Sequence, residues 1–329
     1  MLWGDKPYNS LNYSLKNKFG TKIAKISIDG GFTCPNRDGT KSFGGCIFCS
    51  SKGSGDFAES RIMPIREQIE KGKEQTAKKW KNTKYIAYFQ SYTNTYSSVS
   101  DLRKKYYEAI NCDDICGIAI ATRPDCLPED VLELLSEINE KTYLWVELGF
   151  QTANEETAKF INRGYTNDVF EKAIKELKNR NIEVVVHTIL GLPNESHEDM
   201  INTVKYVTSF PIDGIKLQLL HVLRDSRLYS YYINKGFHIL SQEEYTDIII
   251  EAIENIPENV VIHRLTGDGN RENLIEPLWS LDKRGTLNLI HKKMRKNNSF
   301  QGKKLKKCRN LFVYILKVLY NNIAIMYFM

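Results

Sequence analysis

The chain has 329 residues, of which 42% are hydrophobic and 26% charged, so it is long enough for one large core with an appendage. Its 20 glycines and 9 prolines follow no repeat, which excludes collagen and low-complexity disorder. The net charge of +6 is a C-terminal feature. Residues 291–309 hold nine Lys and Arg and no acid, Lys317 adds one more cation, and residues 1–290 therefore sum to −4.

The first twenty residues contain no apolar run, so we expect no signal peptide. From residue 22 to about residue 220, apolar β-branched runs alternate with amphipathic stretches. The predicted strands are Lys22–Ile28, Tyr85–Phe89, Gly117–Ala121, Tyr143–Gly149, Ile182–Leu190 and Gly214–Leu220. The predicted helices lie near 61–80, 100–111, 127–139, 155–180 and 196–209. Six βα units in series predict an α/β fold with a parallel sheet, and because a closed barrel needs eight units, we expect a partial (β/α)6 barrel.

The pattern changes after residue 220. We expect a helix over 242–257, a short strand over Val260–Ile262 and a helix over Leu287–Lys296. The chain is therefore divided into a barrel (1–225), a C-terminal α/β extension (226–300) and a tail (301–329) that is first basic and then apolar. Residues 311–329 fit either a helix packed on the body or a tail anchor in contact with a membrane.

Three cysteines follow the first predicted strand. Cys34, Cys46 and Cys49 have the spacing C-x11-C-x2-C within a glycine-rich loop, residues 31–50. Parallel α/β folds place functional groups after the carboxyl ends of strands, and without an export signal such a cluster favours metal or redox chemistry over disulfides. Three thiolates fit a [4Fe–4S] cluster with one open iron. The alternatives are a structural zinc site, which normally takes a fourth ligand, and buried cysteines without metal.

Four polar motifs follow later strands or lie at their ends. They are YFQSYTNTY (88–96), ATRPD (121–125), ELGFQTANEETAKFINRGY (147–165) and HTILGLPNES (187–196). Together with the cysteine loop they resemble the radical S-adenosylmethionine (SAM) superfamily over residues 5–300. The resemblance is to its YhcC-like branch, which is similar to the elongator catalytic subunit and to oxygen-independent coproporphyrinogen dehydrogenases. The commonest superfamily spacing is C-x3-C-x2-C, and the longer first gap is a departure that the YhcC-like branch shares.

This resemblance implies the cofactors and several contacts to them. A [4Fe–4S] cluster on the three cysteines would cleave SAM reductively to a 5′-deoxyadenosyl radical. Gln151 and Arg163 have the separation of a pair that binds the SAM ribose and carboxylate in related enzymes, although a surface ion pair is the alternative for Arg163. His187 stands where relatives have an acid, and a core histidine is its alternative. The full set of predicted cofactor-binding residues is Phe48, Ser91, Thr122, Gln151, Arg163, His187 and Gly191.

Candidate substrate residues lie further along the chain. HRLTGDGNRENLIEPLW (263–279) contains Arg264 and Asp268, and Lys216 lies in the sixth predicted strand. These side chains would bind an anionic substrate or close a lid over the radical. The alternative for the segment is a loop in which Asp268 bonds to its own backbone.

The resemblance implies a cytoplasmic enzyme that modifies tRNA at the wobble uridine, trimming a C5 carboxymethylaminomethyl group to aminomethyl. The basic residues 291–309 are compatible with RNA phosphates, and a solvated basic helix is the alternative. A reductant such as flavodoxin or ferredoxin would supply the electron. Two other functions stay open: a radical SAM enzyme acting on a small metabolite, and a zinc-stabilised RNA-binding protein without catalysis.

Overall fold

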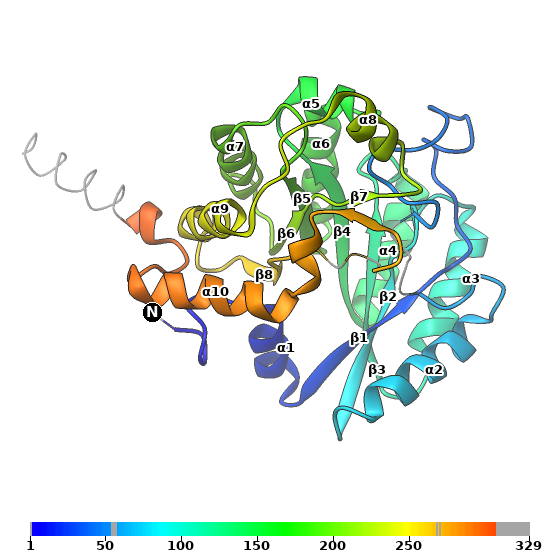
Figure 1. Ribbon diagram of the computed structural model, residues 1–329. Coiled ribbons are helices and arrows are strands. Elements are labelled where there is room, and N and C mark those ends of the chain that lie inside the picture. The colour runs from blue at the N-terminus through cyan, green and yellow to red at the C-terminus, as the bar shows by residue number, and fades with distance from the viewer. Residues whose placement is uncertain (1, 54–57, 268, 270, 307–329) are drawn as a thin grey trace, which may run out of the picture.

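The computed structural model describes residues 2–53, 58–267, 269 and 271–306. Its central element is a parallel sheet of seven strands that curls into an open half-barrel (Figure 1). In spatial order the strands are β1 (Lys22–Ile28), β2 (Thr83–Phe89), β3 (Ile115–Thr122), β4 (Tyr143–Gln151), β5 (Glu183–Leu190), β6 (Gly214–Leu219) and β8 (Val261–Arg264). The six predicted barrel strands are confirmed, with ends displaced by at most two residues.

The seventh strand enlarges the predicted sheet. Val260–Ile262 was expected as a short strand after the six barrel strands, and the structure shows that β8 joins the barrel sheet by pairing in parallel with β6. The N-terminal segment covers the outer edge of β8, because the Ile262 amide donates to the Asn9 carbonyl at 2.7 Å. This contact satisfies a main-chain group that an open sheet edge would leave unpaired.

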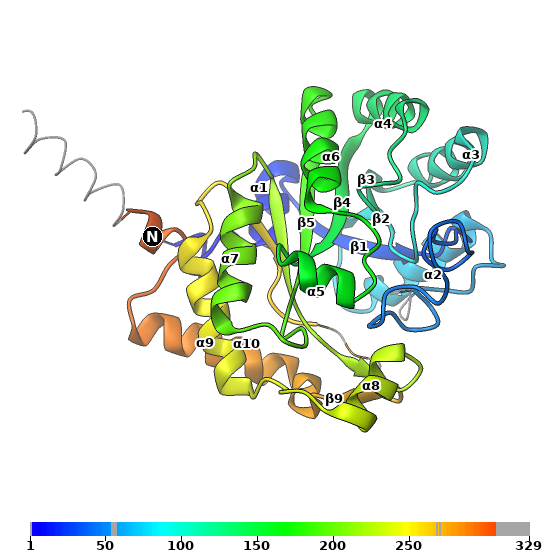
Figure 2. The ribbon, with the colours of Figure 1, turned by 90° about the horizontal axis from the view of Figure 1, so that it is seen from above.

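Helices pack around the outer face of the sheet, as Figure 2 shows from above. They are α2 (Ile65–Ala77), α3 (Val99–Ile110), α4 (Glu129–Lys141), α5 (Glu155–Phe160), α6 (Asn167–Asn179) and α7 (His197–Thr208). The expected continuous helical stretch over 155–180 is wrong, since α5 and α6 are separate. Asn162 and Gly164 between them have left-handed φ angles of 57° and 79°, which end a helix.

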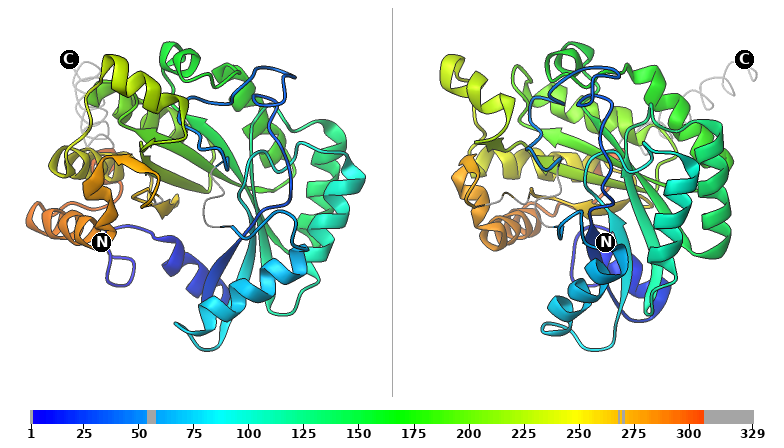
Figure 3. Two further views of the ribbon diagram at one scale, coloured as in Figure 1. Left: turned by 45° about the vertical axis from the view of Figure 1, so that its right-hand side comes forward. Right: turned by 90° about the vertical axis from the view of Figure 1, so that its right-hand side faces the viewer.

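The C-terminal part adds α8 (Arg227–Lys235), α9 (Gln242–Asn255), a 3₁₀ turn (Leu278–Leu281) and α10 (Lys283–Lys296) (Figure 3). A small antiparallel pair joins β7 (Val222–Leu223) to β9 (Leu274–Glu276). Helices α9 and α10 confirm the two predicted helices. The described helices include none that is both long and apolar enough to cross a bilayer. Residues 311–329, for which a packed helix or a membrane contact was expected, lie outside the described part.

The inside of the half-barrel is filled at one end only. Ile23, Ile86, Trp145 and Val185 point inward from four strands and pack together with Leu15 of α1 (Leu11–Phe19). Because side chains alternate along a strand, the inward positions two residues further on form the next layer toward the carboxyl ends. That layer is polar, and the site begins there.

Candidate functional site

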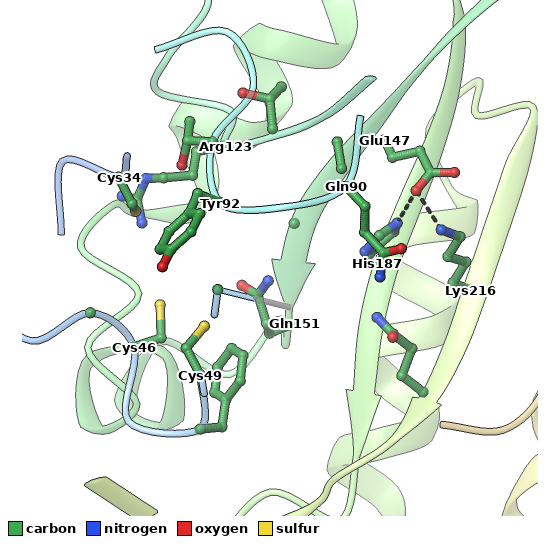
Figure 4. A pocket seen from close by; sticks show the side chains of 18 of the residues that line it. Cys34, Cys46, Cys49, Gln90, Tyr92, Arg123, Glu147, Gln151, His187 and Lys216 are labelled. Carbon is green, nitrogen blue, oxygen red and sulfur yellow. Dashed lines mark hydrogen bonds and ion pairs between the residues drawn. The ribbon is translucent and has the colours of Figure 1, made fainter. Parts of the chain in front are cut away.

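A cavity occupies the carboxyl-terminal half of the barrel interior, where the strand-end rule predicted the site (Figure 4). The loop after β1 borders one end of it, and inward-facing residues of β2, β4, β5, β6 and β8 line the other. Nine of the predicted site residues line this cavity: Cys34, Cys46, Phe48, Cys49, Thr122, Gln151, His187, Lys216 and Arg264.

The three predicted cysteines lie at one end. The sulfurs of Cys46 and Cys49 point into the same hollow, and the Cys49 amide donates to the Cys46 carbonyl at 3.1 Å (Figure 4). A hydrogen bond from Cys49 lowers the pKa of the Cys46 thiol to about 7, with help from Arg123. Within the described residues, no three His, Cys, Asp or Glu side chains converge closely enough to hold a single metal ion. The thiols instead border a shared space beside two guanidinium groups, those of Arg37 and Arg123, which suits an anionic iron–sulfur cluster.

The cysteine loop is fastened to the segment that follows α5. Asn36 is fully buried, and its amide nitrogen lies 2.6 Å from the Asn162 carbonyl oxygen and 3.7 Å from the Cys46 sulfur. The Ile47 amide donates to the Ile161 carbonyl at 3.0 Å. A hydrogen bond to a ligating sulfur is a known means of tuning a cluster, so Asn36 both holds the loop and faces the metal position.

Arg163 is buried among contacts within the protein and does not border the cavity in which SAM is expected. It is 1% exposed, and it is not among the residues that line the cavity. All five of its N–H groups are used: they donate to the carbonyls of Phe150, Thr152 and Tyr165 and to the side chains of Glu155 and Asn167. The guanidinium therefore holds the end of β4 against α5 and α6, and the predicted contact with SAM stays a prediction.

We expect Arg163→Gln to destabilise the metal-free protein by about 3–5 kcal/mol, because several buried hydrogen bonds to a charged group are lost together. Urea unfolding of the metal-free protein measures this. A residue that acted only on the SAM carboxylate would leave the metal-free stability unchanged and weaken SAM binding alone, and that result would contradict the structural role.

The other predicted cofactor-binding residues differ in whether they line the cavity. The Thr122 hydroxyl is buried 2.5 Å from that of Thr95. Ser91 is buried and does not line the cavity, and its hydroxyl has no hydrogen-bond partner among the described residues. Gly191 also lies outside the lining, and its amide contacts the Met200 sulfur at 3.1 Å. Asp268 is not among the described residues.

Gln151 lies between the two ends of the cavity (Figure 4). Its φ of 69° is unusual for a residue with a side chain, and its register against β5 is shifted by a bulge. A Cβ at position 149 would lie 2.8 Å from the Gln151 amide nitrogen, so a side chain there would displace this amide. The backbone thus turns this amide into the cavity, where no described residue hydrogen-bonds to it.

The opposite end contains a buried charge cluster that the sequence prediction found only in part. Glu147 is fully buried, and its carboxylate accepts from Trp145 Nε1 at 2.8 Å, from His187 Nε2 at 2.8 Å and from the Lys216 ammonium. Lys216 also donates to the Tyr88 hydroxyl at 2.9 Å. Although burial opposes ionisation, the charges of Lys216 and Lys25 hold the pKa of Glu147 well below its ordinary value.

Glu147, Tyr88, Tyr92 and Gln218 were not predicted as site residues, yet all four line the cavity. Glu147 had a signal in the sequence, because it is a lone acid inside an apolar strand, and such acids are rarely buried without a partner. Tyr92 follows β2 with φ of 61° and donates to the Ser51 carbonyl at 2.6 Å. Its signal was its place within the polar motif 88–96.

Comparison with known proteins agrees with this geometry. Residues 34–207 match the family described as the radical SAM superfamily, and residues 212–296 match the radical SAM C-terminal domain. The chain is similar to the uncharacterized protein YtqA of Bacillus subtilis, with 45% identity over 299 residues that cover 91% of this chain and 93% of that one. It is also similar to protein YhcC of Escherichia coli, with 36% identity covering 83% of this chain and 88% of that one.

Among solved structures, Elp3 from the archaeon Methanocaldococcus infernus superposes with a TM-score of 0.65. The match covers 85% of this chain and 64% of that chain at 18% sequence identity. At this identity the match shows a shared fold, which is the partial barrel with a C-terminal extension that the sequence predicted.

Proposed function

This chain belongs to the radical SAM superfamily, and on that premise we propose that it modifies tRNA by trimming a carboxymethylaminomethyl group on C5 of the wobble uridine to aminomethyl. Enzymes of this superfamily use a [4Fe–4S] cluster and SAM and need a reductant. The alternative of a zinc-stabilised RNA-binding protein without catalysis is therefore wrong. A flavodoxin or ferredoxin as the electron donor, and a cytoplasmic location, belong to the same proposal.

The residues present fit these cofactors. When bound, the cluster supplies the electron that cleaves SAM into methionine and a 5′-deoxyadenosyl radical. Cys34, Cys46 and Cys49 would hold three of its irons, and the chain's other lining residues would position the nucleoside and keep water out. Gln151 lies between the cysteines and the charge cluster, Thr122 lines the same cavity, and in this proposal both would contact SAM.

The RNA part of the proposal is supported by kinship and by one surface. Elp3 shares this fold, and the resemblance to the elongator catalytic subunit is what favours tRNA as the substrate. Within residues 291–306, Lys293, Lys303, Lys304 and Lys306 form ion pairs with acids of α9 or just beyond it. The cations that remain, Lys292, Arg295 and Lys296, are exposed and form no ion pair with a described residue. This exposed cationic face of α10 is the main observation in support of an RNA substrate, because exposed cations can displace the counterions of phosphates.

Nucleoside mass spectrometry of tRNA from a deletion strain tests the proposal. We expect carboxymethylaminomethyl uridine to accumulate and its aminomethyl product to disappear, and the parent gene to restore the profile. The triple variant Lys292→Ala, Arg295→Ala, Lys296→Ala should lower tRNA affinity at least tenfold and flatten its dependence on salt. The matched control removes Lys78, Lys79 and Lys81, which are equally exposed but lie at the amino-terminal end of the sheet. An unchanged nucleoside profile in the deletion strain would refute the wobble-uridine substrate.

A small metabolite is the second candidate. The observation that favours it is the pairing of four of the basic residues with acids, which reduces the positive surface offered to RNA. If SAM cleavage is robust while both tRNA affinity and the nucleoside profile are insensitive to this protein, the small-metabolite function is preferred.

A further inference from the structure

The end of the cavity farthest from the cysteines is a built polar site. Three neighbouring strands place nitrogen-bearing side chains in register: His187 of β5 pairs with Lys216 of β6, and Lys216 pairs with Arg264 of β8. Adjacent residues of paired parallel strands point to the same face, and strands lie about 4.8 Å apart. All three side chains line the cavity.

The internal bonds of this row decide what it offers to a ligand. Glu147 accepts from three donors, and Lys216 is engaged by Glu147 and Tyr88. Nε2 of His187 is hydrogen-bonded to Glu147, while Nδ1 has no hydrogen-bond partner among the described residues. Burial and the nearby charge of Lys216 lower the pKa of His187 to about 4, so the imidazole is neutral at pH 7. With Nε2–H donating to the carboxylate, Nδ1 is left as an acceptor on a side chain that lines the cavity.

Arg264 supplies the complementary group. It ends β8 at the same level, half-buried, and its charge contributes to the pKa shifts of Tyr88, His187 and Lys216, which places it beside them. A guanidinium presents a planar fork that matches a carboxylate.

We propose that this end of the cavity is a subsite for an N-substituted glycine group, in which Arg264 pairs with the carboxylate and Nδ1 of His187 accepts a hydrogen from the amine. A carboxylate one carbon away from an amine needs a cation and an acceptor side by side, and the row from β5 to β8 provides both. The subsite rests on the proposed function in assigning this group to the side chain of a modified uridine. It adds the residues that distinguish the carboxylate-bearing substrate from its product.

The test uses the reconstituted holoenzyme with SAM and without reductant, so that binding is measured without turnover. The probes are two fluorescent anticodon stem-loops that differ only at the wobble base, one with carboxymethylaminomethyl uridine and one with aminomethyl uridine. We expect the parent to bind the first at least tenfold more tightly, and Arg264→Gln to remove that preference while the affinity for the second changes less than twofold. His187→Phe should weaken binding of both, because both carry the amine. As a control, Arg224→Gln alters an exposed arginine that does not line the cavity.

The outcomes separate the subsite from the proposed function. If the parent prefers the carboxylate-bearing stem-loop and Arg264→Gln keeps that preference, the subsite is refuted and the tRNA function stands. If neither stem-loop binds more tightly than unmodified RNA, the tRNA function fails, and calorimetry with N-methylglycine and with methylamine then tests the subsite alone. Binding of N-methylglycine that Arg264→Gln abolishes would support the subsite for a small metabolite, and no binding would refute it.

Discussion

Cys34→Ala is expected to abolish both cluster assembly and SAM cleavage. After anaerobic reconstitution, iron should fall from about four atoms per chain to below one, and 5′-deoxyadenosine formed with SAM and dithionite should fall to the level without enzyme. Cys46→Ala and Cys49→Ala should behave alike, because all three thiols border the same hollow. Each ligand is needed since the fourth iron must stay open for SAM.

Neighbouring thiols are not expected to substitute for the lost one. Cys126 is buried, and burial raises the pKa of its thiol to about 12, so it is a poor ligand at neutral pH. The matched control is Cys112→Ala, which removes a buried thiol that contacts the Glu108 carbonyl at 3.3 Å, far from the cavity. It should retain its iron and its SAM cleavage. A Cys34→Ala protein with full iron and activity would place the cluster elsewhere in the chain.

The barrel strands could be predicted because each is a short, nearly continuous apolar run, as strands covered on both faces must be. Helix α1 had no such signal, since Leu15 is its only fully buried residue and its position depends on packing across the barrel end. The pair β7–β9 consists of strands of two and three residues that lie fifty residues apart. No local sequence pattern predicts pairing between two such short and distant strands.

The site divides in the same way. The three cysteines could be predicted because ligands that come from one loop lie close together in the sequence and have a recognisable spacing. The role of Glu147 was not, because its partner Lys216 is 69 residues away and meets it only when β4 and β6 curl toward each other. The surroundings of Arg163 could not be predicted from local spacing either. Its distance from Gln151 suggested a shared ligand, but five neighbours in the folded chain use all its donors.

Glu147→Gln is expected to cost about 3–5 kcal/mol of unfolding free energy at pH 7, because it leaves the buried ammonium of Lys216 without a counter-charge. Urea unfolding of the metal-free protein measures the loss. The double variant Glu147→Gln, Lys216→Met removes both charges and should recover most of it. Glu70→Gln, which breaks an exposed ion pair with Lys73 on α2, should cost less than about 1 kcal/mol.

The pH dependence of that cost identifies its cause. Burial already lowers the pKa of Lys216 below its ordinary value of 10.5, and without Glu147 the folded state resists protonation of this amine further. The unfolded chain then binds more protons than the folded one, so the stability of Glu147→Gln should rise with pH up to about 10.5. Its deficit relative to the double variant Glu147→Gln, Lys216→Met, which lacks the titrating amine, should therefore shrink from pH 7 to pH 10. A deficit that stays constant over this range would mean that lost packing, not an unpaired charge, destabilises the variant.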